Sequence, residues 1–227
     1  MENEKTTNKY LSILTNFGCH FSCPYCVVKN CGIDIPKTTV EGLQGLEKAI
    51  VENECNWVSI SGGGDPFYKL EEHTDWWNKL FEIVFDGDLE VGLEIHTSYL
   101  PDTFDDDATP FAIFDRVVYH CRNISDLFRI KRYANQIVRV VFVVTEDATE
   151  AKINDIAAIV RHHPDIDELS FRQMIDKDYQ VTHYCEDYLK AGHKKDWYYI
   201  EQGDYNLYYV ENEVKTRYAD YAVAKED

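Results

Sequence analysis

The sequence predicts an α/β fold with a parallel sheet, and three observations favour it. Short apolar runs alternate with amphipathic stretches along the 227 residues, which is the pattern of repeated βαβ units. Hydrophobic residues make up 44% of the chain and aromatic residues 14%, enough for one sizeable core. No internal repeat or linker divides the chain, so we expect a single domain over residues 1–227.

Six strands and four helices are expected from this alternation. The expected strands are Tyr10–Thr15, Trp57–Ser61, Leu89–His96, Arg116–His120, Ile137–Val144 and Glu168–Met174. The expected helices are Thr38–Val51, Leu70–Val84, Asn123–Tyr133 and Thr149–Arg161. The first helix has Thr38 or Thr39 as its N-cap and Glu41 in its first turn, where an acidic side chain is favourable.

The third expected strand alternates in polarity. Its two faces carry Leu89, Val91, Leu93 and Ile95 on one side and Glu90, Glu94 and His96 on the other. A parallel strand that is buried on both faces reads instead as continuous apolar sequence. The same alternation directs Ser59, Ser61, Arg139 and Arg172 of other strands inward. We therefore expect the interior of the curved sheet to be polar.

Three cysteines stand close together after the first strand. Cys19, Cys23 and Cys26 have the spacing C-x3-C-x2-C. Three thiolates at this spacing can bind three irons of a cubane 4Fe–4S cluster and leave the fourth iron open, whereas a closed cluster uses four cysteines. Zinc is the alternative, with His20 or Cys31 as a fourth ligand.

A glycine-rich turn follows the second expected strand. Its sequence is Gly62-Gly63-Gly64-Asp65-Pro66. Glycine allows the backbone to approach a ligand closely because it has no Cβ. Carboxyl ends of parallel strands meet at one rim, which is the working end of (β/α) barrels. The cysteine loop and the glycine turn are therefore expected on the same rim.

The cysteine spacing and the glycine turn together resemble the radical SAM superfamily. The resemblance implies a partial (β/α)6 barrel, with a core at about residues 9–176 and an extension at about 177–227. It also implies a 4Fe–4S cluster on Cys19, Cys23 and Cys26, with S-adenosylmethionine on the open iron. In that superfamily the reduced cluster cleaves S-adenosylmethionine to a 5′-deoxyadenosyl radical, which abstracts hydrogen from the substrate. The chain would then be an enzyme with an electron donor such as flavodoxin or ferredoxin as partner.

The resemblance also implies a set of cofactor-binding residues. Tyr25 precedes the last cysteine, where the family places an aromatic residue beside the adenine, and Gly62, Gly63, Gly64 and Asp65 would hold the methionine end. Asp65 departs from the family, whose turn usually has Glu. Thr97 and Ser98 close the third strand, where ribose- or carboxylate-binding groups are common, and His120 closes the fourth. Alternatively, Thr97 and Ser98 form a strand-end turn and His120 is a packed histidine at the rim.

Glu94 and Arg172 are the expected substrate-binding, catalytic side chains of the interior. Both lie on inward-facing strand positions. The alternative is a structural ion pair of Glu94 with Arg139 or Arg172, because buried charges need partners in either case.

The C-terminal extension departs from the strand–helix alternation. Two tyrosine-rich runs, Trp197–Ile200 and Tyr205–Val210, flank Gly203-Asp204. Glycine first in a two-residue turn favours a type II′ hairpin. We expect a short hairpin that caps the open barrel, forms a partner surface or packs on the barrel wall.

Composition and motifs narrow the function without naming a substrate. The net charge of −18 argues against extended nucleic-acid binding, and no apolar run is long enough to span a membrane. The polar N-terminus and the scattered other cysteines indicate the reducing cytoplasm. We expect an undefined polar substrate, either a small molecule or a peptide. The alternatives are an activating enzyme that makes a protein or peptide radical, a deazapurine-type synthase, and a non-catalytic zinc or cluster binding module. The deazapurine-forming synthases have a Thr after the last cysteine, near a magnesium ion, whereas this chain has Val27 at that position.

Overall fold

The computed structural model describes residues 8–87, 89–103, 110–175, 180–201, 203 and 206–221. The strands are β1 Tyr10–Thr15, β2 Trp57–Gly62, β3 Gly92–Thr97, β4 Arg116–Cys121, β5 Ile137–Val144, β6 Glu168–Gln173, β7 Tyr198–Ile200, β8 Leu207–Val210 and β9 Glu213–Lys215. The α-helices are α1 Val27–Asn30, α2 Leu46–Glu52, α3 Thr74–Phe81, α4 Glu150–Arg161 and α5 Glu186–Gly192. A π-helical segment, Glu82–Asp86, continues α3.

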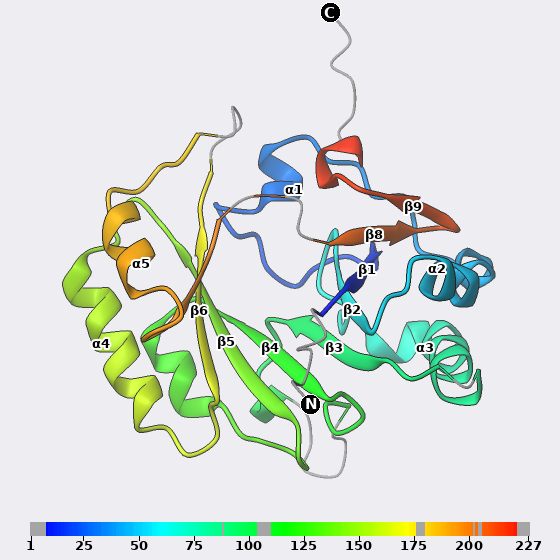
Figure 1. The fold of residues 1–227 in the computed structure, drawn as a ribbon, viewed down its shortest axis with the longest axis horizontal. Coiled ribbons are helices and arrows are strands. Elements are labelled where there is room, and N and C mark those ends of the chain that lie inside the picture. Colours follow the sequence, from blue (N-terminus) through cyan, green and yellow to red (C-terminus); the bar gives the residue numbers. More distant parts are fainter. Residues whose placement is uncertain are drawn as a thin grey trace, which may run out of the picture.

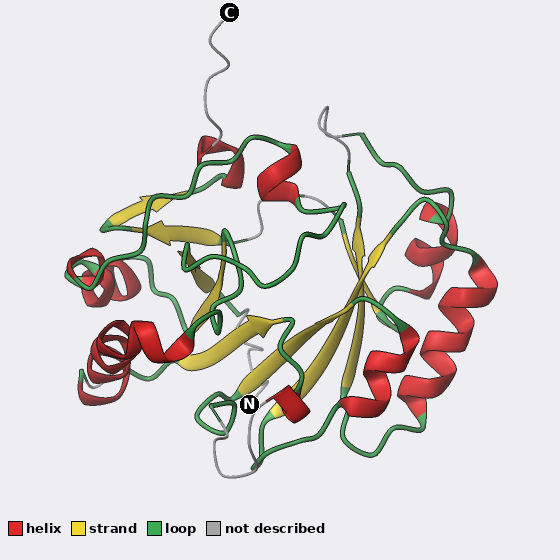
Figure 2. Cartoon of the chain, turned by 180° about the vertical axis from the view of Figure 1, so that it is seen from behind, coloured by secondary structure: helices red, strands yellow, loops and turns green. Residues whose placement is uncertain are grey.

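The strands form one curved sheet in the order β7-β6-β5-β4-β3-β2-β1-β8-β9. Every neighbouring pair from β7 to β8 is parallel, and only β8 and β9 pair antiparallel. The helices α2 to α5 lie on the outer side of the curve (Figures 1 and 2). The fold is therefore an α/β partial barrel, as the sequence predicts.

The prediction of a hairpin between the two tyrosine-rich runs is wrong. The first run forms β7, which pairs with β6, and the second forms β8, which pairs with β1 at the other side of the sheet. A C-terminal hairpin does exist, but it joins β8 to β9 through Glu211 and Asn212, which both have positive φ angles. That geometry suits the turn types of two-residue hairpins. Asp204, part of the expected turn, lies outside the described residues.

Three of the expected helices are shorter or more irregular than the sequence predicts. The one expected over Thr38–Val51 begins with a 3-10 turn at Glu41–Leu43, and α2 starts only at Leu46. Gly42 and Gly45 stand in this stretch, and glycine weakens a helix interior. The helix expected over Asn123–Tyr133 is a 3-10 helix, Ile124–Arg129, opened by a capping box of Asn123 and Asp126. The helix over Leu70–Val84 divides into a 3-10 turn, α3 and the π segment.

The main core lies between the outer face of the sheet and the helices. Leu93 and Ile95 of β3 are almost fully buried there, and Ile153 and Ile156 of α4 pack into the same cluster. Burying a side chain of this size contributes about 1.5–3 kcal/mol. The inner face of the sheet is polar, which leaves a site for chemistry inside the curve.

Candidate functional site

One cavity of about 320 Å³ opens at the carboxyl ends of the strands. Its wall includes twelve of the thirteen predicted site residues: Cys19, Cys23, Tyr25, Cys26, Gly62, Gly63, Gly64, Asp65, Thr97, Ser98, His120 and Arg172. They come from the carboxyl ends of β2, β3, β4 and β6 and from the loop between β1 and α1. Glu94 is the exception, since it does not line the cavity.

The cysteine loop carries three free thiols at the mouth of this cavity. Cys19 is exposed, and Cys23 and Cys26 are half-buried. The backbone N–H of Phe21 donates to Cys19 Sγ over 3.4 Å. Burial raises the pKa of the Cys19 thiol, and the N–H of Phe21 acts in the opposite direction. A thiolate donor set of this kind suits soft metals and iron–sulfur clusters.

No group of three His, Cys, Asp or Glu side chains within the described residues is arranged around a single metal-ion position. Ligands of a cubane cluster bind different irons, so they need not converge on one point as zinc ligands do. The fourth ligands considered for zinc, His20 and Cys31, do not line the cavity. The three cysteines therefore fit a cluster better than one ion.

The three glycines of the turn are needed for contacts within the chain. A Cβ on Gly64 would lie 1.9 Å from the carbonyl oxygen of Gly18, and one on Gly62 would lie 2.2 Å from that of Thr15. A Cβ on Gly63 would lie 2.9 Å from Ile35. Close approach of this backbone to a ligand, which the sequence predicts, stays a prediction. The missing side chains leave room for β1 and the cysteine loop, while the backbone of the turn lines the cavity.

Asp65 ties the ends of β2 and β3 together. Its Oδ1 accepts hydrogen bonds from the Phe67 N–H and the Thr97 hydroxyl, at 3.0 and 2.8 Å. Its Oδ2 accepts from the N–H and the hydroxyl of Ser98, both at 2.7 Å. A carboxylate has about four lone-pair sites, so this one is saturated. Asp65 thereby fixes Thr97 and Ser98 on the rim.

Glu94 lies beneath the cavity and is only 4% exposed. It accepts hydrogen bonds from Ser59 Oγ at 3.0 Å and from Arg116 at 3.0 Å, and it contacts His96 Nε2 at 2.9 Å. Its ion-pair partner is thus Arg116, and the predicted pairing with Arg139 or Arg172 is wrong. Arg139 pairs instead with Glu168 of β6, at 2.6 Å.

The buried groups of the interior have displaced pKa values. Burial raises the pKa of Glu94, but His96 and Arg116 outweigh it and hold that pKa at about 2. Burial lowers the pKa of His120 to about 3, helped by His96 and by the positive charge of Arg172. Near neutral pH the interior therefore contains an ionised Glu94 and an uncharged His120.

No protein-family model and no curated protein matches the chain. Among solved structures, it is similar to native anSMEcpe, a radical SAM anaerobic sulfatase-maturating enzyme, with bound AdoMet and Cp18Cys peptide. The TM-score is 0.51 at 16% sequence identity, over 81% of this chain. The chain shares the fold of that structure. The match spans 57% of the length of anSMEcpe.

The fold also brings residues to the site that the sequence did not reveal. Arg122 follows β4, lines the cavity, and holds its guanidinium carbon 3.4 Å from the ring centroid of Phe21. Arg122 comes just after a predicted strand, and this position in the sequence could have identified it as a residue of the rim. Asn206 and Tyr208 also line the cavity, and Asn206 donates to Ser12 Oγ at 2.8 Å. They could not be found, because the pairing of β8 with β1 was not expected.

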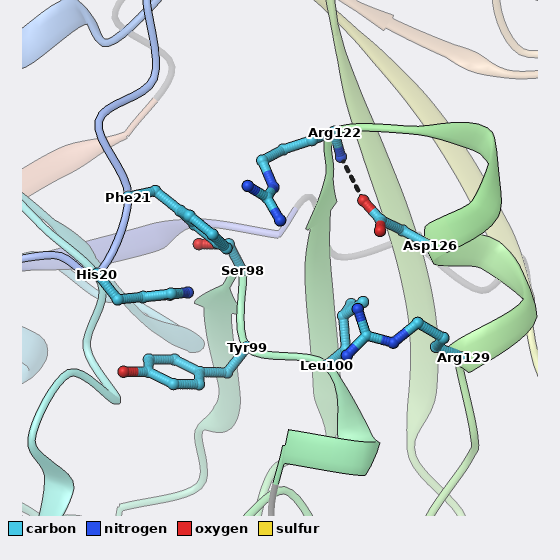
Figure 3. A pocket seen from close by; sticks show the side chains of 8 residues that line it. All are labelled: His20, Phe21, Ser98, Tyr99, Leu100, Arg122, Asp126 and Arg129. Atoms are coloured by element: carbon cyan, nitrogen blue, oxygen red, sulfur yellow. Dashed lines mark hydrogen bonds between the residues drawn. The ribbon is translucent and has the colours of Figure 1, made fainter.

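A second cavity, of about 220 Å³, lies next to the cysteine loop (Figure 3). The ring of His20 stands between those of Phe21 and Tyr99, with centroids 3.8 and 3.9 Å away. The backbone N–H of Arg122 donates to Asp126 at 2.8 Å on the opposite wall.

The described part of the chain has no helix that is both long and apolar enough to cross a membrane.

Proposed function

We propose that this chain is a radical SAM enzyme that abstracts hydrogen from a polar substrate. The observation that carries the proposal is the single cavity that gathers three cysteine thiols, the glycine turn and a polar interior at the carboxyl ends of parallel strands. When bound, a 4Fe–4S cluster and S-adenosylmethionine would supply one electron and a 5′-deoxyadenosyl radical there. Cofactors of this kind carry the difficult chemistry, and the protein binds, orients and shields them.

The residues of the cavity would divide this work by position. Cys19, Cys23 and Cys26 would hold the cluster, and Tyr25 lies in the same loop to pack against the adenine. The backbone of Gly62–Asp65 would face the methionine end. Asp65 does not act by its carboxylate, which is saturated, but keeps the Thr97 and Ser98 hydroxyls in place.

Further polar residues would complete the wall of the cavity. His120 of β4 and Arg172 of β6 both line it. Arg172 and His96 are polar groups that a polar substrate can contact, while Val141 and Val143 give that wall an apolar stretch.

A peptide is a specific candidate substrate. The similar solved structure, anSMEcpe, is described with AdoMet and a Cp18Cys peptide. We propose a peptide as one substrate class for the present chain as well. An electron donor of the flavodoxin or ferredoxin type would be the protein partner.

Cluster assembly tests this proposal. We expect the anaerobically reconstituted parent to bind about four irons and four sulfides. Replacing Cys19, Cys23 or Cys26 by Ala should remove most of the iron and the electron paramagnetic resonance signal of the reduced cluster. Cys31→Ala is the matched control, since Cys31 lies in the same region but does not line the cavity. A full cluster in Cys23→Ala, or one tightly bound zinc in the parent, would contradict the assignment.

A further inference from the structure

A chain of hydrogen-bonded side chains runs from the cavity wall to the floor of the barrel. His120 Nε2 lies 3.0 Å from His96 Nδ1, and His96 Nε2 lies 2.9 Å from Glu94 Oε1. Ser59 and Arg116 hold Glu94 from β2 and β4. His120 and His96 line the cavity, whereas Glu94 is buried below them.

The contacts limit where the protons of this chain can lie. An ionised carboxylate only accepts hydrogen bonds, so His96 Nε2 carries a proton and donates it to Glu94. In the state in which neither imidazole carries a charge, His96 Nδ1 is an acceptor, and the proton between the rings is on His120 Nε2. The Nδ1 atom of His120 then holds a lone pair, and within the described residues it has no hydrogen-bond partner.

We propose that Glu94, His96 and His120 form a proton relay, in which His120 Nδ1 takes a proton from the substrate. This inference rests on the proposed function. The substrate class is one with a hydroxyl, thiol or ammonium group near the carbon that loses hydrogen. The O–H, S–H or N–H bond breaks, its electron pair stays on the heteroatom, and a new N–H bond forms at His120 Nδ1. The Nε2 proton of His120 moves to His96 Nδ1, and no electron is transferred.

The relay places the positive charge where the protein can stabilise it. His120 itself is a poor site for a cation, because it is half-buried in the interior near the positive charge of Arg172 of β6. His96 lies beside the carboxylate of Glu94, whose own charge is balanced by Arg116 of β4. On β5 the neighbouring cavity residues are Val141 and Val143, which contribute no charge. His96 and Glu94 are therefore positioning residues, and His120 is the group that meets the substrate.

Nitrogen NMR on the full chain, purified without its cluster and labelled with 15N-histidine, tests the relay. We expect a two-bond nitrogen–nitrogen coupling between His120 Nε2 and His96 Nδ1, a proton on His96 Nε2, and an unprotonated His120 Nδ1 at pH 7. In Glu94→Gln, we expect loss of the inter-ring coupling, because an amide can donate as well as accept and no longer fixes the His96 tautomer. The exposed His162 gives the control, since His162→Gln should keep the coupling.

The parent spectrum decides the inference even if Glu94→Gln fails to fold. A proton on His120 Nδ1, a missing coupling, or a charged His120 at pH 7 would overturn the relay. None of these signals needs a cluster or S-adenosylmethionine. Failure of the relay is therefore distinguishable from failure of the proposed function, which iron content and cofactor cleavage report.

Discussion

At the scale of single residues, Asp65 organises the rim of the cavity. Four hydrogen bonds from Phe67, Thr97 and Ser98 converge on its carboxylate, which is 3% exposed. Because Asp65 stands in the glycine turn, the sequence predicts that it contacts the cofactor. For its backbone, that contact stays a prediction. Three of these four bonds come from Thr97 and Ser98 at the end of β3, more than thirty residues away. No local pattern could have revealed them.

Asp65→Asn should destabilise the protein by about 1–3 kcal/mol. The amide nitrogen cannot accept, so donors that now meet a carboxylate oxygen lose their partner inside the protein. Urea denaturation measures the loss in the free energy of unfolding. Asp155→Asn, at an exposed position of α4, should stay within about 0.5 kcal/mol of the parent. An Asp65→Asn protein as stable as the parent would mean that the hydrogen-bond network is not formed in solution.

Gly64→Ala should displace the cysteine loop, because its Cβ would lie 1.9 Å from the backbone oxygen of Gly18. A backbone atom cannot move aside as the end of a side chain can. We expect reduced iron content after reconstitution together with a lower melting temperature. Gly32→Ala is the comparison. Gly32 has a φ of +63° with nothing within 4 Å of its added Cβ, so that variant should cost only about 1 kcal/mol of backbone strain and keep its iron.

At the scale of elements, the β8–β9 turn secures the C-terminal part to the start of α2. Asn212 Oδ1 accepts from the Gly45 N–H at 2.7 Å and from the Tyr209 hydroxyl at 3.1 Å, and its Nδ2 donates to the Glu41 carbonyl at 3.0 Å. Asn tolerates the positive φ of 66° that this turn position requires. One residue thus connects a late hairpin with an early helix.

Asn212→Ala should lower the free energy of unfolding by about 2–3 kcal/mol, because it removes these hydrogen bonds and strains the backbone. Asn212→Gly restores the freedom of φ but not the bonds, so it should lie between the parent and the Ala variant. Chemical denaturation of the three proteins separates the two contributions. Equal stability of the Ala and Gly variants would show that the positive φ costs nothing here.

The sequence predicts elements well where the signal is local and poorly where the partner is distant. Strands β1, β2 and β4 to β6 begin at their expected residues, because apolar runs bounded by turns carry the information themselves. The tyrosine-rich runs were correctly seen as strands, but they join opposite parts of the sheet. Likewise, alternation predicts that Glu94 faces inward, and only the register, which pairs Glu94 with Arg116 across β3 and β4, identifies its partner. The cysteine motif needs no such register.

At the scale of the whole molecule, an acidic chain forms a barrel with an ionised, hydrogen-bonded floor. The chain carries a net charge of −18, while its floor contains the pairs Glu94–Arg116 and Arg139–Glu168. Breaking one buried pair leaves an uncompensated charge and costs about 3–5 kcal/mol. The floor therefore holds β3 to β6 together beneath the cavity.

Stability should fall when the pH drops below about 6.5. His120 has a pKa of about 3 in the folded protein against 6.5 ordinarily, so between these values the unfolded chain binds the extra proton. Above pH 6.5 His120 does not lower the free energy of unfolding. Between pH 6.5 and 5 the free energy of unfolding falls by about 1–2 kcal/mol. The carboxyl of Glu94, held at about 2, adds a further loss only below about pH 4.5.

Urea unfolding at several pH values tests this dependence. We expect a shallower slope between pH 6.5 and 5 for His120→Gln, and an unchanged slope for His162→Gln, whose side chain is exposed. A parent protein with no slope in this range would mean that the pKa of His120 is not lowered in the folded protein.

Cleavage of S-adenosylmethionine tests the central claim most directly. Reconstituted parent protein, reduced with dithionite under anaerobic conditions, should convert S-adenosylmethionine to 5′-deoxyadenosine and methionine, which chromatography with mass detection quantifies. The Cys23→Ala variant should form none, and Cys31→Ala should behave like the parent. Formation of 5′-deoxyadenosine that depends on Cys19, Cys23 and Cys26 would support radical SAM chemistry in this cavity. A reduced, cluster-replete parent that forms no 5′-deoxyadenosine would contradict it.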